Sequence, residues 1–171
     1  MHSLMITKYG DLNTSLEIQE VPIPAIGPNQ ILIKSHAASF NPLDFKTVRG
    51  DFKAIRKIQF PIGIGRDVSG VIEKVGEKVK KFKVGDKVYS RIDENFVGTM
   101  AEYVISNAAD VALMPSNLNF REAASIPLAG LTVYQSLIDI AKLSSGNNIL
   151  IHAGSGGVGT IAIQLSKYLG A

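Results

Sequence analysis

Residues 148–159 read Asn-Ile-Leu-Ile-His-Ala-Gly-Ser-Gly-Gly-Val-Gly, and a helical pattern follows as far as Ala171. An apolar run, a Gly-x-Gly-x-x-Gly turn and a helix, in this order, open a fold that binds dinucleotides. In such a turn the first glycine allows a sharp bend and the second lets a pyrophosphate approach the backbone. The third lets the helix pack closely on the strand. The stretch therefore predicts a strand at Ile149–Ile151, a phosphate-binding turn and a helix.

The helix after this turn supports the prediction. Apolar residues recur there at helical spacing, namely Val158, Ile161, Ala162, Leu165 and Leu169. Gly170 is placed as a C-cap, and the N–H groups at the helix start would meet phosphate charge. The expected cofactor-binding residues of the turn are Gly154, Ser155, Gly156, Gly157, Val158 and Gly159. The alternative is a glycine-rich connection that holds no ligand.

The composition is that of an ordinary globular protein. The chain has 171 residues, of which 46% are hydrophobic and 19% charged. It has no cysteine, which excludes disulfides and thiolate metal sites. Its apolar stretches are too short to span a bilayer, and the N-terminal apolar run is too short for a signal peptide. We therefore expect a cytoplasmic protein with no membrane partner.

The net charge of +3 lies in one segment. Between Glu73 and Lys87, six lysines stand against three acidic residues, which accounts for the whole excess. A surface for single-stranded nucleic acid would interleave aromatic residues with the basic ones, and here only Phe82 does so. A solvated hairpin face is the favoured interpretation, and nucleic acid is not an expected partner.

Short strands separated by turns are expected over the first hundred or so residues. The predicted strands are Leu16–Val21, Ile31–Phe40, Val68–Val75, Lys87–Ser90, Ala101–Ile105 and Val111–Leu113. This spacing favours an antiparallel barrel or sandwich. From Phe120 the hydrophobic period becomes helical, with Pro127 suited to start a helix and Gly146 to mark the exit from it. We expect a β-rich module followed by an α/β segment.

The order of these segments resembles the medium-chain dehydrogenases/reductases, and within them the zinc-free quinone oxidoreductase branch. The matching pieces are Asn41–Lys46, Gly65–Ile72, Val75–Gly76, Val79, Phe82–Val88, Ala123–Ala124, Pro127–Thr132 and the glycine turn. The resemblance implies a mixed fold. A GroES-like catalytic domain would occupy residues 1–125, and a linking helix with the truncated start of an NAD(P)-binding Rossmann domain residues 126–171. About half of a family member would then be present.

The implied activity is hydride transfer from NADPH to a quinone or an α,β-unsaturated carbonyl. NADH stays open as a cofactor, because the residue that decides between them falls roughly 20 residues after the glycine turn. We expect the 171-residue chain alone to be inactive and to self-associate through the unpaired edge of Ile149–Ile151. A naturally short, inert binding or assembly module is the alternative, and a basic module that binds nucleic acid through its lysine-rich turn is a third possibility.

A metal is not expected. Zinc-dependent relatives carry cysteine where Asn41 stands and a histidine–glutamate pair where Arg66 and Asp67 stand. Asn41 offers no thiolate, and an always-charged guanidinium does not ligate zinc. The three histidines are scattered along the chain.

Asn41 and Thr132 are the expected catalytic residues. From the residues alone, Asn41, Pro42 and Asp44 also read as the N-cap, N1 and N3 positions of a short helix. The resemblance implies that Asn41 faces the nicotinamide and the substrate carbonyl, where its amide would orient the substrate by hydrogen bonding. It implies likewise that Thr132 holds the nicotinamide carboxamide and so also contacts the cofactor. The alternative for Thr132 is a helix-surface threonine.

Other polar side chains are weaker candidates. Lys46 and Arg49 are suited to contact phosphate or substrate, or only to solvate a helix. Tyr89 and Tyr103 each offer a phenol, but both read as strand tyrosines at the edge of the barrel. The sequence assigns no proton donor.

Overall fold

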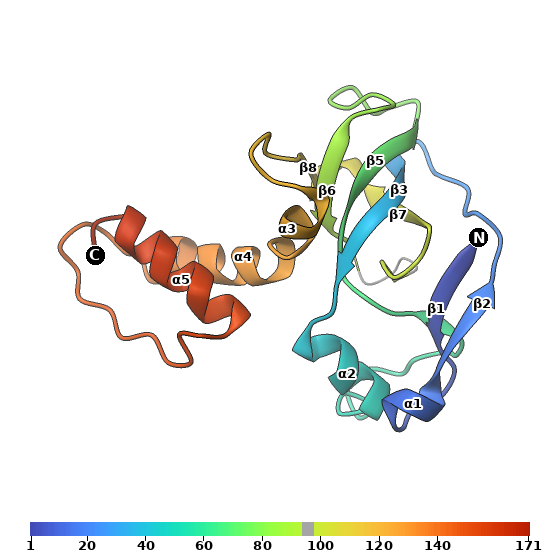
Figure 1. The fold of residues 1–171 in the computed structure, drawn as a ribbon, viewed down its shortest axis with the longest axis horizontal. Helices are drawn as coiled ribbons and strands as arrows, with labels where there is room; N and C mark the ends of the chain where they lie inside the picture. Colours follow the sequence, from blue (N-terminus) through green and yellow to red (C-terminus); the bar gives the residue numbers. More distant parts are fainter. Residues whose placement is uncertain (94–97) are drawn as a thin grey trace. The chain divides into compact units, whose positions relative to one another are not determined.

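A computed structural model of the protein describes residues 1–93 and 98–171 (Figure 1). It divides the chain into two compact units, Met1–Ser125 and Ile126–Ala171. The first is rich in β-structure and the second is helical, so the mixed fold class is confirmed. Among the helices in the described residues, none is both long and apolar enough to cross a membrane.

Two antiparallel sheets form the frame of the first unit. The larger has the strand order β7-β3-β5-β6-β8 and the smaller β2-β1-β4. The strands are β1 (His2–Ile6), β2 (Leu16–Glu20), β3 (Gln30–Ser39), β4 (Ile62–Gly63), β5 (Asp67–Val75), β6 (Lys87–Arg91), β7 (Tyr103–Asn107) and β8 (Val111–Leu113). The six predicted strands are present. β7 starts two residues later than expected, while β1 and β4 were not predicted.

The main core lies inside the larger sheet. Its strand residues are β-branched, namely Ile31, Ile33, Val68, Ile72, Val88, Val104 and Val111, and Phe82 and Ile92 join them from outside the strands. Burying one such side chain contributes about 1.5–3 kcal/mol. A second cluster, Ile6, Val48 and Ile64, joins the helix after β3 to the smaller sheet.

That helix, α2 (Pro42–Arg49), begins where the sequence predicts. Asn41 is its N-cap, Pro42 its first residue and Asp44 its third. It ends at Gly50, whose φ of 81° is the left-handed conformation that glycine adopts without strain. The other helices of this unit are α1 (Leu12–Ser15), the 3₁₀ turn η1 (Ala108–Asp110) and α3 (Phe120–Ala124).

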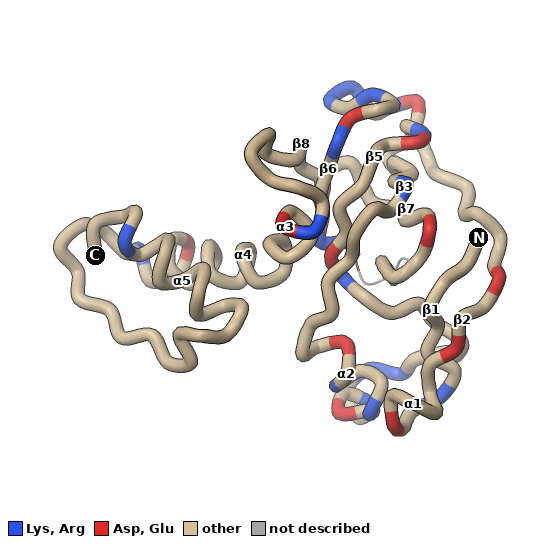
Figure 2. Tube along the Cα trace, in the orientation of Figure 1, with Lys and Arg blue, Asp and Glu red and all other residues tan. Residues whose placement is uncertain are grey.

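Helix α3 is fixed to the larger sheet through its first residue. The Phe120 ring stacks on His36 of β3 with 4.3 Å between centroids, and Lys87 Nζ of β6 lies 5.8 Å from the ring centre. Ser69 Oγ of β5 donates a hydrogen bond of 2.5 Å to the Phe120 carbonyl. The basic segment, Glu73–Lys87, runs from the end of β5 to the start of β6, where Figure 2 shows basic side chains gathered around a turn.

The second unit consists of α4 (Pro127–Tyr134), the π-helix η2 (Gln135–Ile140) and α5 (Gly157–Tyr168). The predicted helix start at Pro127 is confirmed, but the helical stretch ends at Ile140, before the expected exit at Gly146. Helix α4 packs on α5. Gly170 follows α5 in the left-handed conformation, with a φ of 83°, which agrees with its expected capping role.

The prediction of a strand at Ile149–Ile151 is wrong, because this segment makes no strand-to-strand hydrogen bonds. Residues 148–151 belong to no β-ladder, and Leu150 is 81% exposed. A strand is stabilised by hydrogen bonds to a neighbouring strand, and Ile126–Ala171 contains no other strand to supply them. The helix and turn that follow are present as predicted.

Candidate functional site

Asn41 lies where β3 leads into α2, and its side chain turns toward the larger sheet. Asn41 Nδ2 donates to Asp67 Oδ2 at 2.9 Å and to Ser39 Oγ at 3.2 Å. Ser39 Oγ donates in turn to Asp67 Oδ2 at 2.8 Å. The β3–β5 register places Ser39 directly opposite Asp67, which is 1% exposed. We call these three side chains the Ser39–Asn41–Asp67 triangle.

Asp44 binds the backbone of Asn41 rather than its side chain. Its Oδ2 accepts the Asn41 N–H at 2.6 Å, and the carboxyl is buried. Burial raises the pKa of Asp44 above its ordinary value, as does the charge of Asp67. The Asn41 N–H bond and the charge of Arg66 act against the rise without cancelling it. The capping role is therefore confirmed for Asp44. Asn41 forms the other half of the capping box, with its side-chain oxygen toward the Asp44 N–H, while its amide nitrogen turns to Ser39 and Asp67.

This raised pKa predicts how stability depends on pH. The folded protein holds the Asp44 proton to a higher pH than the unfolded chain does. Stability is therefore lost as the pH rises from the ordinary value of 3.8 through the raised pKa. Asp44→Asn does not titrate there and keeps an oxygen for the cap. Urea unfolding across this range should show the wild type losing stability relative to Asp44→Asn as the pH rises, and a constant difference would contradict the prediction.

The glycine turn lies at the start of α5. Gly156 is the N-cap, with extended backbone, and its N–H bonds to the Ala153 carbonyl at 2.9 Å. A Cβ at Gly159 would overlap that same carbonyl oxygen and lie 2.7 Å from Gly154 Cα, so this position requires glycine. A Cβ at Gly157 would meet nothing within 4 Å. The first-turn N–H groups of an α-helix have no intrahelical partner, and the turn therefore fits a pyrophosphate.

The remaining residues of the predicted cofactor site, Ser155, Val158 and Thr132, belong to the second unit. Ser155 is exposed beside the N-cap, and Val158 is 44% exposed in the first turn of the helix. Thr132 belongs to α4 of the same unit, and its Oγ1 donates to the Leu128 carbonyl at 2.7 Å. Because this bond uses the hydroxyl hydrogen, Thr132 can offer a ligand only an acceptor while it lasts. Asn41 belongs to the other unit.

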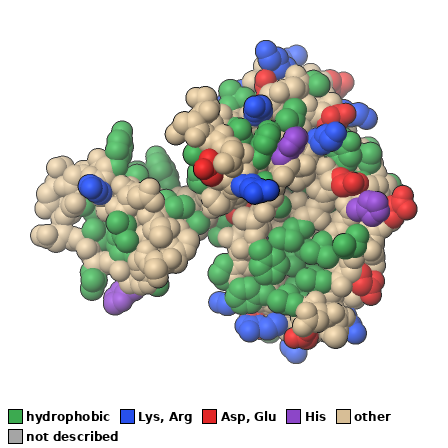
Figure 3. All heavy atoms as spheres, in the orientation of Figure 1, with side chains coloured by type: hydrophobic (Ala, Val, Ile, Leu, Met, Phe, Trp, Pro, Cys, Tyr) green, Lys and Arg blue, Asp and Glu red, His purple; other side chains and the backbone are tan. Residues whose placement is uncertain are grey.

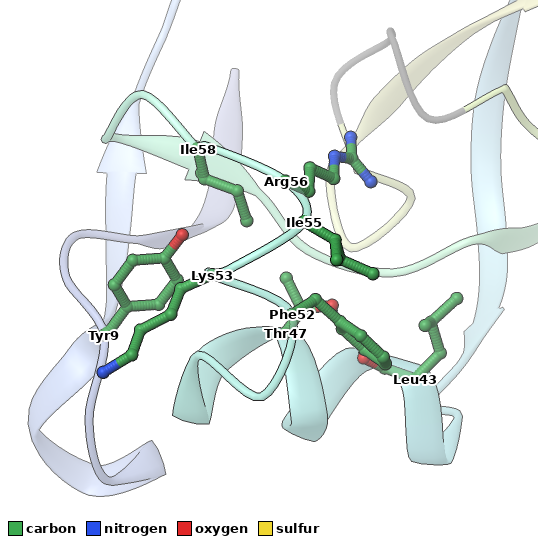
Figure 4. Close-up of a pocket in the computed structure, with 8 residues that line it drawn as sticks. All are labelled: Tyr9, Leu43, Thr47, Phe52, Lys53, Ile55, Arg56 and Ile58. Atoms are coloured by element: carbon green, nitrogen blue, oxygen red, sulfur yellow. The ribbon is translucent and has the colours of Figure 1, made fainter.

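A small apolar pocket lies beside α2. Figure 4 shows Leu43 and Thr47 of the helix facing Phe52 in the loop that follows it. The cavity measures about 260 Å³ and is lined by Tyr9, Leu43, Thr47, Phe52, Lys53, Ile55, Arg56 and Ile58. Figure 3 shows hydrophobic side chains gathered on the face around α2. This pocket was not predicted, because its walls come from α2 and from loops that are separate in the sequence.

The weaker candidates from the sequence, Lys46, Arg49, Tyr89 and Tyr103, do not line this pocket. Arg49 Nη2 bonds to Asp51 Oδ2 at 2.9 Å, and its guanidinium carbon lies 5.5 Å from the centre of the Phe45 ring. Lys46 is exposed on α2. Tyr89 and Tyr103 lie in β6 and β7, as strand tyrosines should.

The absence of zinc stays a prediction. In residues 1–93 and 98–171, no three His, Cys, Asp or Glu side chains gather as metal ligands. Asn41 and Arg66 stand where zinc-dependent relatives place ligands, and a catalytic zinc needs three from the protein. Elemental analysis of the purified chain should find no stoichiometric zinc, and a chelator should leave its melting temperature unchanged. One tightly held zinc ion per chain would contradict this.

The comparisons with known proteins identify the family. Residues 27–116 match the alcohol dehydrogenase GroES-like domain. The chain is 43% identical to a 2-methylene-furan-3-one reductase of Solanum lycopersicum, over 99% of this chain and 45% of that protein. It is 37% identical to an NADPH-dependent alkenal/one oxidoreductase, chloroplastic, of Arabidopsis thaliana, with the same coverages.

A solved structure agrees. The quinone oxidoreductase from Coxiella burnetii superposes with a TM-score of 0.91 at 39% identity, over 99% of this chain and 54% of that one. The chain thus spans about half the length of the relatives it matches. It belongs to the alcohol dehydrogenase GroES-like domain family, within the medium-chain dehydrogenase/reductase superfamily.

Proposed function

We propose that this chain is the N-terminal part of an NADPH-dependent reductase that acts on quinones or enones without zinc. The observation that carries the proposal is the glycine turn at the start of α5, where Gly159 lies against the backbone of Ala153. This is the close packing that a pyrophosphate-binding turn requires. The names of the relatives, an enone-type reductase and an NADPH-dependent alkenal/one oxidoreductase among them, support the same reading.

The acceptor in this proposal is an electron-poor, largely apolar small molecule. The pocket beside α2 is lined mainly by apolar and aromatic side chains, which suits a quinone ring or the carbon chain of an enone. Simple alcohols are expected to be poor substrates, since their oxidation in this superfamily relies on zinc to lower the pKa of the hydroxyl. Neither nucleic acid nor a membrane enters the reaction, and we place the protein in the cytoplasm.

Each candidate residue has a defined role in the proposal. The bound nicotinamide supplies a hydride. Gly154, Ser155, Gly156, Gly157, Val158 and Gly159 hold the pyrophosphate. Asn41 and Thr132 fix the position of the nicotinamide against the acceptor, so that binding energy is used for orientation.

The test is turnover by the complete product of the gene. NADPH and NADH oxidation are followed against a panel of quinones, enones and alcohols. Asn41→Ala should lower kcat by about 10- to 100-fold while changing the affinity for NADPH much less. Asn117→Ala is the matched control, because Asn117 is exposed and lies outside the site. Alcohol oxidation without quinone or enone reduction would refute the proposal.

The same assay applied to the 171-residue chain tests the fragment part of the proposal. We expect no turnover and only weak NADPH binding, because the turn offers a phosphate a few N–H groups and little else. The unpaired backbone at residues 149–151 also favours self-association. Micromolar affinity for NADPH in calorimetry would contradict this expectation.

A further inference from the structure

The Ser39–Asn41–Asp67 triangle fixes which way round the Asn41 amide lies. A side-chain amide has one end that only donates hydrogen bonds and one end that only accepts them. The Asn41 Nδ2 group faces a carboxylate oxygen and a serine hydroxyl. The serine hydroxyl gives its own hydrogen to the same carboxylate oxygen. Every bond in the triangle therefore has one donor and one acceptor.

The opposite orientation would break this arrangement. Rotating the amide by half a turn would bring Asn41 Oδ1 against Asp67 Oδ2, and two acceptors would then face each other. Asp67 is almost fully buried at the start of β5, so solvent does not relieve such a contact. Asp67 thus selects one orientation, and Ser39 supports it from the opposite position on β3.

We propose that Asp67, together with Ser39, is a positioning residue that leaves Asn41 only its carbonyl oxygen for contact with a ligand. This inference rests on the proposed function. The group that meets Asn41 is then a hydrogen-bond donor, either the carboxamide N–H of the nicotinamide or a ribose hydroxyl. Asn41 does not donate to the substrate carbonyl, which corrects the expectation drawn from the sequence. The developing negative charge on the acceptor oxygen must be met by another group.

A reciprocal exchange of the two side chains tests this in the complete protein. Asn41→Asp alone places two carboxylates face to face and should lower kcat by about 100-fold or more. The double variant N41D/D67N restores a donor-to-acceptor pair, with the amide now at position 67 and an acceptor again available at position 41. Its kcat should recover to within about tenfold of the wild type. If Asn41 acts as a donor, no recovery is possible, because a carboxylate has no N–H.

The control removes a buried hydroxyl from the same strand. Ser69 is fully buried two residues after Asp67, but it bonds to the Phe120 carbonyl and not to Asn41. Ser69→Ala should lower the melting temperature and leave kcat within about twofold of the wild type. A loss of kcat in this variant as large as in Asn41→Asp would show that the effect is merely structural.

A cofactor analogue separates the two donors. The reduced 3-acetylpyridine analogue of NADPH has no carboxamide N–H but keeps both ribose hydroxyls. If the carboxamide is the donor, Asn41→Ala should abolish the preference of the enzyme for NADPH over the analogue. If a ribose hydroxyl is the donor, that preference should persist. The wild type could also show no preference between NADPH and the analogue. If Asn41→Ala then weakens the binding of both cofactors equally, the donor is a ribose hydroxyl.

One measurement does not depend on the reductase activity. In NMR spectra of the 171-residue chain, the Asn41 side-chain amide hydrogens should exchange slowly with solvent. Their shifts should change in Asp67→Asn and not in Ser69→Ala. Fast exchange would overturn the positioning role. Slow exchange would support the positioning role even if the complete protein reduced neither quinones nor enones. That combination of results would refute only the proposed function.

Discussion

Valine at position 156 is expected to abolish NADPH binding by the complete protein, with a Kd raised at least about 100-fold. Gly156 is the N-cap of α5, and the family pattern places the pyrophosphate against this glycine. A Cβ here would lie 3.3 Å from the Ala153 carbonyl oxygen, a contact that small shifts relieve, so the fold should survive. The branched side chain would occupy the space that the phosphate needs. Calorimetric titration with NADPH measures the effect.

The matched control is valine later in the same helix. Gln164 is exposed on α5 and lies outside the turn. Gln164→Val should therefore bind NADPH like the wild type, although it adds the same branched side chain to the same helix. Equal affinities of Gly156→Val and the wild type would mean that the turn does not hold the cofactor.

Alanine at Gly70 is expected to destabilise the first unit by about 3 kcal/mol, at the upper end for overpacking in a core. Gly70 is buried in β5, opposite β3. A Cβ there would overlap the backbone carbonyl oxygen of Lys34 and lie 2.8 Å from Ile33 Cγ2. The backbone of a central strand cannot move aside without breaking its ladder. Urea unfolding monitored by circular dichroism gives the loss.

A second glycine separates this steric effect from the cost of backbone conformation. Gly85 has a φ of +91°, but a Cβ there would meet nothing within 4 Å. Gly85→Ala should therefore lose only about 1 kcal/mol, the strain of a left-handed residue. Losses of similar size in the two variants would show that β3 and β5 are not packed as closely as described.

The strands that the sequence could predict are those whose side chains alternate. β3, β5 and β6 bury Ile and Val on one face, and that period is visible in a short window. β1 was missed because its signal is weaker. It is short, and it buries Ser3 beside its apolar residues. Residues Ile149–Ile151 do form an apolar run, but a strand also needs a neighbouring strand to bond with. A local sequence pattern does not show whether such a neighbour is present.

The site was predictable to a similar extent. The glycine turn and the cap positions of α2 follow local rules of spacing, and the structure has them where those rules put them. The partners of Asn41 do not follow such rules. Asp67 reaches Asn41 through the β3–β5 register, which shifts between Leu32 and Ile33 and again between Ser35 and Ala37. Only the observed pairing of β3 with β5 shows that Ser39 lies opposite Asp67. The direction of the Asn41 amide follows from that pairing.

The boundary at Ser125 also bears on how such an enzyme could diversify. Asn41, its two anchors and the apolar pocket lie in Met1–Ser125, whereas the glycine turn lies in Ile126–Ala171. In the proposed function, the apolar pocket for the acceptor and the turn for the pyrophosphate lie on opposite sides of one peptide bond. A single genetic crossover there between homologues would exchange the acceptor pocket and conserve the pyrophosphate turn. Chimeras joined at this bond should inherit their ranking of acceptors, measured as kcat/KM, from the parent of residues 1–125.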